Sequence, residues 1–216
     1  MNNHFTLFQS DWIFDFSPLK IIEKSRQIGI TYADAYHSVL LVTRKGALLD
    51  VWVSSRDETQ AKLYLEDCKH WADFLHLAAV DLGIVILDHD QNISARVLEF
   101  ANGRRIYCVS SNPNALAGKR GHVKLDEFAL HPDQRLLYRV AKPVTQWGGS
   151  LSIISTHRGA NTLFNQIITR IKSFSASASA SSSLAAPKSD EGGSHPFNPI
   201  NSINPFNFST DRKSVV

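Results

Sequence analysis

The sequence predicts an α/β domain in which a largely parallel sheet is flanked by helices. Two observations predict this fold class. Up to about residue 171, short apolar runs rich in β-forming residues alternate with stretches whose apolar residues recur at helical spacing. Strands that alternate with helices in this way are typical of parallel sheets built from βαβ units.

The second observation is an abrupt change of composition at residue 173. The chain reads SFSASASASSSLAA there and then becomes rich in Ser, Pro, Asn and Gly. Such a segment cannot bury enough apolar area to offset the entropy lost on ordering. We therefore expect a folded domain over residues 1–172 and a disordered tail over residues 173–216.

Length and composition are those of an ordinary globular protein. A chain of 216 residues can bury one sizeable core, and its formal charge of +3 permits contact with nucleic acid without arguing for it. The first residues form no secretory signal, and no apolar run is long enough to span a membrane. Cys68 and Cys108 match no metal-binding spacing and are expected to be reduced. We expect a cytoplasmic protein without membrane contact.

The first elements follow from local patterns. Residues 19–23, LKIIE, form a short apolar strand that ends at a loop, and residues 31–44 have apolar positions at helical spacing. Residues 48–54 form a β-rich run. Residues 57–78 form a long amphipathic helix opened by acids, whose charges suit a helix amino terminus.

A hairpin and a strand ending in acids come next. Asn102 and Gly103 form a strong turn signal between the strands predicted at 95–100 and 105–110. The segment 122–128, HVKLDEF, is a short strand that ends in two acids. It is less apolar than an ideal central strand, so Lys124 is expected to point to an edge or to emerge near the strand end.

The last elements are a helix at 132–142 and a buried strand at 150–156. That strand ends in hydroxyl residues and is followed by an imidazole, giving Ser155, Thr156 and His157. Polar side chains at the carboxyl end of a parallel strand line the ligand crevice, where they can sense a γ-phosphate. The alternative for His157 is an ordinary surface histidine.

The loop KSRQIGIT, residues 24–31, has the length of a phosphate-binding loop. Gly29 and Thr31 occupy two fixed positions of the motif G-x-x-x-x-G-K-[ST], but Ile30 stands where the motif has its lysine. A glycine lets the backbone approach phosphates, and the threonine hydroxyl is placed to bind Mg²⁺. The alternative is a strand-turn-helix with a conveniently placed glycine.

The missing cation can come from elsewhere in the same loop. Lys24 and Arg26 both have side chains long enough to reach a phosphate from the opposite side of the loop. A point charge needs only proximity, so its origin in the sequence can move.

The acids Asp126 and Glu127 are the natural partners of such a loop. In nucleotide hydrolases an aspartate at a strand end holds Mg²⁺, and a following glutamate polarises the attacking water. The alternative is an acid pair that caps the next helix. Loop and acids, each at a strand terminus and in this order, favour a P-loop NTPase of the ASCE type that uses ATP and Mg²⁺.

Three segments together resemble the ATPase domain of the large terminase subunit, the DNA-packaging motor of tailed bacteriophages, and especially that of Mu-like prophages. They are KSRQIGIT, SSNPNALAGKRGHVKLDEFA at 110–129 and WGGSLSIISTHRGANTLF at 147–164, and the resemblance extends over roughly residues 10–172. Phosphate loops of this family are often deviant, and some carry the lysine at the start of the motif.

The resemblance implies a role for each of these residues. Lys24 becomes the phosphate lysine, Arg26 the arginine that stabilises the transition state, and Gln27 a residue that orders the loop. Thr31 and Asp126 become the Mg²⁺ ligands, and Glu127 the catalytic glutamate. The further assignments are nucleotide contacts from the whole loop (Lys24, Ser25, Arg26, Gln27, Ile28, Gly29, Ile30 and Thr31), a coupling motif (Ser155, Thr156 and His157) and adenine stacking (Trp12, Phe14 or Phe16).

The function implied by the resemblance is ATP hydrolysis that drives double-stranded DNA into a prohead in the cytoplasm of a bacterial host. Its partners would be double-stranded DNA, a small terminase subunit and a portal protein, with the motor working as a ring of identical chains. The basic stretch GKRGHVK, with Lys119, Arg120 and Lys124, is a candidate DNA contact; a solvated loop is the alternative.

One departure from the family pattern affects the prediction. Large terminase subunits continue into a nuclease domain of the ribonuclease H type, but here the Ser/Ala and Asn/Pro tail begins where the linker to that domain belongs. We therefore expect a truncated product without nuclease activity. The alternatives are a prophage remnant that binds nucleotide without turnover and a plain α/β binding protein; a helicase-type ATPase would need a second motor domain, which this length excludes.

Overall fold

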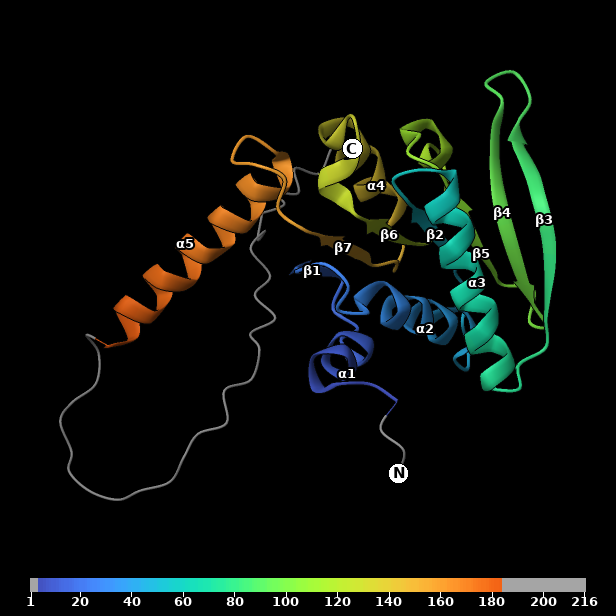
Figure 1. The fold of residues 1–216 in the computed structure, drawn as a ribbon, viewed down its shortest axis with the longest axis horizontal. Helices are drawn as coiled ribbons and strands as arrows, with labels where there is room; N and C mark the ends of the chain where they lie inside the picture. Colours follow the sequence, from blue (N-terminus) through green and yellow to red (C-terminus); the bar gives the residue numbers. More distant parts are fainter. Residues whose placement is uncertain (1–3, 184–216) are drawn as a thin grey trace, which may run out of the picture. The chain divides into compact units, whose positions relative to one another are not determined.

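The computed structural model describes residues 4–183 and contains one seven-stranded sheet with the strand order β1-β7-β6-β2-β5-β4-β3 (Figure 1). Strands β1, β7, β6, β2 and β5 are parallel, whereas β4 and β3 run antiparallel at one edge. The strands are β1 (Leu19–Glu23), β2 (Val51–Ser54), β3 (Ala79–Asp88), β4 (Ile93–Phe100), β5 (Arg105–Val109), β6 (His122–Asp126) and β7 (Leu151–Ser155).

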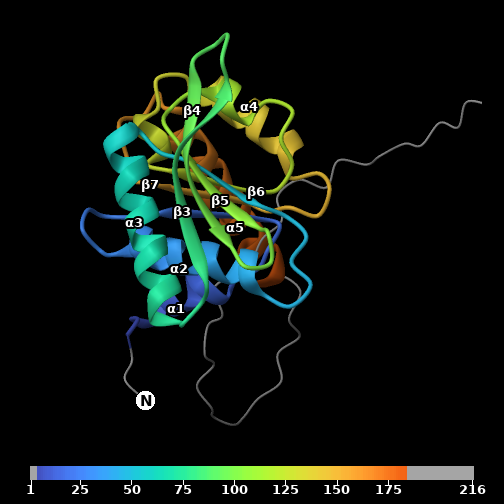
Figure 2. The same cartoon turned by 90° about the vertical axis from the view of Figure 1, so that its right-hand side faces the viewer.

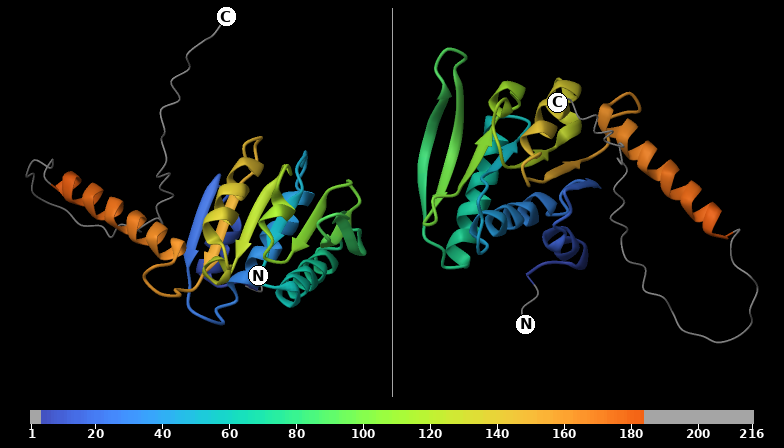
Figure 3. Two further views of the ribbon diagram at one scale, coloured as in Figure 1. Left: turned by 90° about the horizontal axis from the view of Figure 1, so that it is seen from above. Right: turned by 180° about the vertical axis from the view of Figure 1, so that it is seen from behind.

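Helices lie on both faces of the sheet (Figure 3). Helices α2 and α3 pack against each other and share a core with alternate residues of β4, including Leu98 and Phe100. The intervening residues of β4 face the other way, toward the turn that precedes β6 and contacts α4. The helices are α1 (Leu7–Phe14), α2 (Ile30–Thr43), α3 (Glu58–Phe74), α4 (Gln134–Val144) and α5 (Leu163–Ser183), with short 3₁₀ turns η1 (Pro113–Leu116) and η2 (Phe128–Leu130).

The predicted α/β class with a mostly parallel sheet is therefore confirmed. Strand β7 lies between β1 and β6, so the strand that leads into the phosphate loop is separated by one strand from the strand that ends in acids. This insertion is the additional strand expected of an ASCE-type sheet. The carboxyl ends of β1, β7 and β6 all lie at the same edge because the three strands are parallel.

Among the helices and strands, α1, β3 and α5 escaped prediction. Helix α1 precedes the first strand, and β3 forms a long hairpin with β4 that projects at one edge of the sheet (Figure 2). Strand β3 pairs with β4, and the register of the pair shifts at two places: between Asp81 and Gly83, and between Ile86 and Asp88. These bulges interrupt the alternation of apolar and polar residues by which a strand is recognised in a sequence.

The carboxyl-terminal helix was not predicted, and part of it lies in the segment expected to be disordered. Helix α5 runs through residues 173–183, where the composition predicts a disordered tail. Alanine is the best helix former and serine is tolerated, so a Ser/Ala alternation can continue a helix that has already begun. The rest of the predicted tail, residues 184–216, lies outside the described residues.

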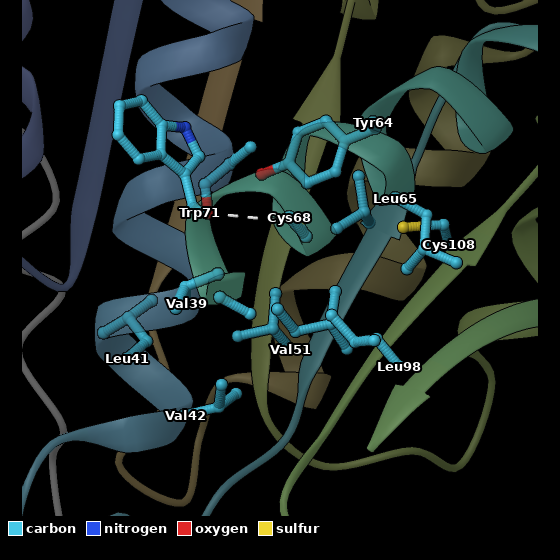
Figure 4. Close-up of a cluster of buried hydrophobic side chains, with 14 of the residues drawn as sticks. Val39, Leu41, Val42, Val51, Tyr64, Leu65, Cys68, Trp71, Leu98 and Cys108 are labelled. Atoms are coloured by element: carbon cyan, nitrogen blue, oxygen red, sulfur yellow. Dashed lines mark hydrogen bonds between the residues drawn. The ribbon is translucent and has the colours of Figure 1, made fainter. Parts of the chain in front are cut away.

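The core beneath the sheet is built from α2, α3 and the inner strands (Figure 4). Val39, Val51 and Leu98 meet there, and Cys68 and Cys108 are both buried and free, as expected. Within residues 4–183, no helix is both long and apolar enough to cross a bilayer.

The expectation for Lys124 is wrong. Strand β6 lies inside the sheet between β2 and β7, and the Lys124 side chain is fully buried. Its Nζ donates to Asp34 Oδ1 at 2.8 Å and to Ser152 Oγ at 3.1 Å. A buried charge is tolerated when it is paired and hydrogen-bonded, and helix α2 supplies the partner through Asp34.

Candidate nucleotide-binding site

The loop between β1 and α2 requires glycine at position 29. Gly29 has φ 72° and is the N-cap of α2, and a Cβ there would lie 2.7 Å from Gln9 Nε2. That amide donates to the carbonyl oxygens of Ile28 at 3.2 Å and Gly29 at 3.1 Å. Helix α1 thus supports the loop, while the first N–H groups of α2 have no partner within the helix and are suited to an anion.

Lys24 points toward the acid pair. Its ammonium forms an ion pair with Glu127 Oε1, and its backbone N–H donates to the Ser155 carbonyl at 3.0 Å. The side chain of Lys24 is 7% exposed and that of Glu127 is 21% exposed, so solvent has little access to Lys24 and partial access to Glu127. The cation at the start of the loop and the acids after β6 therefore meet on one side of the sheet.

Ile30 occupies the usual lysine position and cannot present a cation. It is buried in a cluster with Trp12, Ile13 and Ala33 of the flanking helices and with Ile154 of β7. A lysine at this place would lose its hydration without a carboxylate in the cluster. The core therefore accounts for an apolar residue at position 30.

The two predicted Mg²⁺ ligands are adjacent. Thr31 Oγ1 donates to Asp126 Oδ1 at 3.1 Å. Burial raises the pKa of Asp126 to about 7, with further contributions from the charges of Glu127 and Asp34. Glu127 Oε2 is also buried and has no hydrogen-bond partner among the described residues.

This donor set fits Mg²⁺ held together with a nucleotide. Magnesium prefers oxygen ligands and is usually bound by one or two protein groups plus phosphates and water. Among residues 4–183 there is no cluster of three or more His, Cys, Asp or Glu that could hold a metal without such help. A nearby divalent cation would favour the ionised form of Asp126, which burial disfavours.

The residues predicted to form the coupling motif also lie at the site. Ser155 Oγ accepts from the Ala129 N–H at 2.9 Å, in the turn after the acids, and donates to the Thr156 carbonyl at 3.0 Å. His157 Nε2 pairs with Glu23 Oε1 at the end of β1. The end of β7 thus contacts both the acid turn and the base of the phosphate loop, while the Thr156 side chain is half-buried.

The rest of the loop is more open. Ser25, Arg26 and Gln27 are exposed, and Ile28 is half-buried against the Ile30 cluster. Gln27 has φ 58°, so the loop turns through two left-handed residues before α2 begins. The Arg26 side chain is therefore exposed on this open part of the loop.

The adenine assignments need correction. Trp12 is buried, and its Nε1 donates to Asp34 Oδ1 at 2.8 Å, so its ring is no open platform. Phe16 lines a pocket with His122 and Ser150 at the amino ends of β6 and β7, the edge opposite the loop. Phe14 is exposed, and nothing places it beside the loop.

The basic stretch before β6 likewise lies away from the site. Lys119 lies over the Trp52 ring and Arg120 over the Trp147 ring, with 5.6 and 5.4 Å from cation to ring centroid. Lys124 is buried and therefore unavailable to DNA.

Two residues near the site were missed in the sequence. Gln9 was recognisable, because Thr6-Leu7-Phe8-Gln9 is a capping-box pattern and the Thr6 N–H donates to Gln9 Oε1 at 2.9 Å. His131 had no such signal, since a histidine after a strand is compatible with many roles; its ring bonds to the Asp126 carbonyl.

Strand order, phosphate loop and acid pair define the molecule as an α/β domain of the P-loop NTPase class. Comparison with known proteins narrows this class. The chain belongs to the terminase large subunits: the family described as "Terminase large subunit, T4likevirus-type, N-terminal" matches residues 21–196.

Individual relatives agree with the family. The chain is 35% identical over 164 residues to the Mu-like prophage FluMu protein gp28 of Haemophilus influenzae, covering 74% of this chain and 32% of that protein. It is 36% identical over 169 residues to the probable terminase, large subunit gp28, of Escherichia phage Mu, covering 74% of this chain and 30% of that protein. The chain thus spans about a third of the length of these relatives.

A solved structure has the same fold. The large terminase of a thermophilic bacteriophage, in complex with ADP, superimposes with a TM-score of 0.56 at 16% identity, covering 74% of this chain and 41% of that chain. At this identity the likeness concerns the fold alone.

Proposed function

We propose that this chain hydrolyses ATP as the motor domain of a terminase large subunit and powers the translocation of double-stranded DNA into a prohead. The observation that carries the proposal is the meeting of Lys24, Thr31, Asp126 and Glu127 at the carboxyl ends of β1 and β6. Family membership supports it, as does the ADP bound to the large terminase of the thermophilic bacteriophage.

Each residue would act through its own chemistry. The N–H groups at the start of α2 and the ammonium of Lys24 bind the phosphates, and Thr31 and Asp126 hold Mg²⁺. When bound, Mg²⁺ supplies positive charge against the β- and γ-phosphate oxygens. Glu127 orients the attacking water, and Arg26 neutralises charge that develops on the transferred phosphoryl group.

The Lys24–Glu127 ion pair is compatible with both roles. An ammonium has three N–H donors, so Lys24 can contact the Glu127 carboxylate and a phosphate oxygen together. The pair also keeps the Glu127 carboxylate beside the loop.

Measurement of ATP binding and turnover by the purified chain tests the proposal. Glu127→Ala is expected to retain ATP binding and to lower kcat by roughly 10²- to 10⁴-fold, because it removes the group that orients the water. Lys24→Ala is expected to weaken Mg²⁺-ATP binding itself. Lys69→Ala serves as the matched control, because Lys69 also pairs with acids but lies in α3.

Two outcomes would count against the proposal. An ATP affinity indifferent to Lys24→Ala would remove the moved lysine from the account of the loop. ATP binding without phosphate release, even at high protein concentration, would favour the alternative of a nucleotide-binding domain without turnover.

The partners and the coupling step complete the proposal. Double-stranded DNA, a small subunit and a portal protein are the proposed partners, with several chains forming a ring in the host cytoplasm. Ser155, Thr156 and His157 would transmit hydrolysis from the acid turn to the rest of the motor, because they bridge that turn and the end of β1. The proposal attributes no DNA cleavage to this chain.

A further inference from the structure

His131 is a buried histidine wedged between two loops at the edge of the site. Its side chain is 3% exposed and follows the acid turn. Nε2 lies 3.0 Å from the carbonyl oxygen of Asp126, and Nδ1 lies 2.7 Å from Ser111 Oγ in the loop after β5. The ring therefore connects the end of β6 to the loop of a different strand.

The two contacts define the tautomer of the ring. A carbonyl oxygen can only accept, so the proton must be on Nε2, which donates to Asp126. With the proton on Nε2, Nδ1 of the neutral ring is an acceptor. Ser111 then donates its hydroxyl proton to Nδ1 and keeps the ring in this orientation.

The carbonyl held by His131 belongs to the peptide that joins Asp126 to Glu127. Glu127 has φ 51° and ψ 45°, a left-handed conformation that is strained for a non-glycine residue. The Glu127 carbonyl accepts from the Leu130 N–H at 2.8 Å, which closes the turn on its far side. His131 contacts the peptide that precedes Glu127, through the Asp126 carbonyl.

This conformation decides where the Glu127 carboxylate points. In a continued strand, side chains at successive positions point to opposite faces, so an extended Glu127 would point away from Asp126. The left-handed turn breaks the alternation. Asp126 reaches Thr31 while Glu127 reaches Lys24, and both acids face the phosphate loop.

We propose that His131 is a positioning residue: its bond to the Asp126 carbonyl, oriented by Ser111, holds the left-handed turn that aims Glu127 at the phosphate loop. The role given to Glu127 in turnover rests on the proposed function, whereas the effect of His131 on the turn does not. His131 itself touches neither Lys24 nor Thr31 and is not a catalytic residue.

A merely structural histidine is the competing explanation, and the chain offers a matched control for it. His122 lies at the other end of the same strand, is also 3% exposed, and has Nδ1 2.9 Å from Ser150 Oγ. If His131 only fills space, His131→Ala and His122→Ala should have similar effects on every property.

The test combines steady-state ATP hydrolysis, ATP binding and thermal unfolding. His131→Ala is expected to lower kcat by roughly tenfold to a hundredfold, the scale of a misplaced reacting group, with little change in the Kd for Mg²⁺-ATP. His131→Gln should restore part of the rate, because its amide can donate at a similar reach. Ser111→Ala should lower kcat less, and His122→Ala should lower Tm without this loss of kcat.

A double substitution shows whether the effect passes through Glu127. In a Glu127→Ala background, His131→Ala should have no further effect on the residual kcat. An additive loss, or a loss of kcat equal to that of His122→Ala, would overturn the proposal.

Crystal structures of the unsubstituted chain and of His131→Ala separate this inference from the proposed function. The unsubstituted chain should have a positive φ at Glu127, and His131→Ala should lose both the positive φ and the contact with Lys24. Retention of both in His131→Ala would overturn the role of His131 even if ATP is hydrolysed. Absence of turnover by the unsubstituted chain would count against the proposed function and leave the crystallographic comparison decisive for His131.

Discussion

At the scale of single residues, position 29 is the place in the loop where the structure requires glycine. Two separate effects oppose a side chain there: its left-handed φ of 72°, and the Gln9 amide that a Cβ would meet at 2.7 Å. The chain contains a glycine with only the first effect. Gly46 has φ 77°, and a Cβ there would meet nothing within 4 Å.

We expect both Gly→Ala substitutions to destabilise the fold by about 1–2 kcal/mol through the left-handed conformation. Gly29→Ala should lose more stability than Gly46→Ala, because the Gln9 amide must move and its N–H groups then no longer reach the carbonyls of Ile28 and Gly29. It should also weaken ATP binding, whereas Gly46→Ala should not. Denaturant unfolding and an ATP titration of each variant measure the difference, and equal effects on ATP binding would contradict this explanation.

The reach of Lys24 predicted a cation that has moved to the start of the loop. The structure brings the Lys24 ammonium to Glu127, and its contact with a phosphate stays a prediction. The left-handed Glu127 and its support by His131 were not predictable, because they depend on Ser111, a residue of another loop. A motif names residue types but does not give the backbone conformation that aims them.

At the scale of elements, helix α2 and strand β6 meet along a polar seam, defined by Thr31, Asp34 and His37 on the helix and by Lys124 and Asp126 on the strand. Thr31 bonds to Asp126, Asp34 bonds to Lys124, and His37 Nδ1 lies 2.8 Å from Lys124 Nζ. The seam aligns the helix that begins at the phosphate loop with the strand that ends in acids.

We expect Lys124→Met to destabilise the fold by about 3–5 kcal/mol, because it leaves the Asp34 charge buried without its partner. The pair Asp34→Asn with Lys124→Met should recover much of the loss, since it removes both charges, keeps an acceptor for Trp12 and offers an N–H to the Tyr64 hydroxyl, which can accept it. Denaturant unfolding of the single and double variants provides the measurement. An equally unstable double variant would show that shape, not charge, dominates the seam.

The same seam explains the error in the prediction for β6. Lys124 made HVKL look like an edge strand, because its partner lies 90 residues away in sequence and no local pattern reveals the pairing. Local signals were reliable by contrast. Asp57 caps α3 through the Gln60 N–H at 2.8 Å, and Asn102-Gly103 joins two antiparallel strands.

At the scale of the whole folded unit, Asp126 makes stability depend on pH. Its folded pKa is about 7, above the ordinary value of 3.8, so between these values the folded state holds a proton that the unfolded state has released. The contribution of Asp126 to stability therefore falls as pH rises from about 4 to 7, in the direction that linkage requires.

We expect Asp126→Asn to remove this part of the pH dependence, so that the gain in stability over the unsubstituted chain grows from pH 4 to pH 7. The free energy of unfolding, measured across this range without Mg²⁺, tests the expectation. A difference between the two chains that does not change with pH would show that Asp126 ionises normally in the fold.

The sequence predicted the class of sheet, but it did not predict the order of its strands. Alternating patterns predicted a parallel sheet, but the antiparallel edge with β3 was missed because its register irregularities obscure the strand pattern. Likewise, the Ser/Ala run that resembles a tail continues α5, because a helix once begun extends at little cost.

The anchoring of Lys24 has a mechanical consequence. The backbone N–H of Lys24 donates to the Ser155 carbonyl. The Ser155 hydroxyl also accepts from the Ala129 N–H, in the turn that follows Asp126. A lysine at position 30 would belong to helix α2 and would move with it. Lys24 instead is hydrogen-bonded to the end of β7, the strand between β1 and β6. A shift of β7 would therefore move the backbone of Lys24 and the turn that follows Asp126 together.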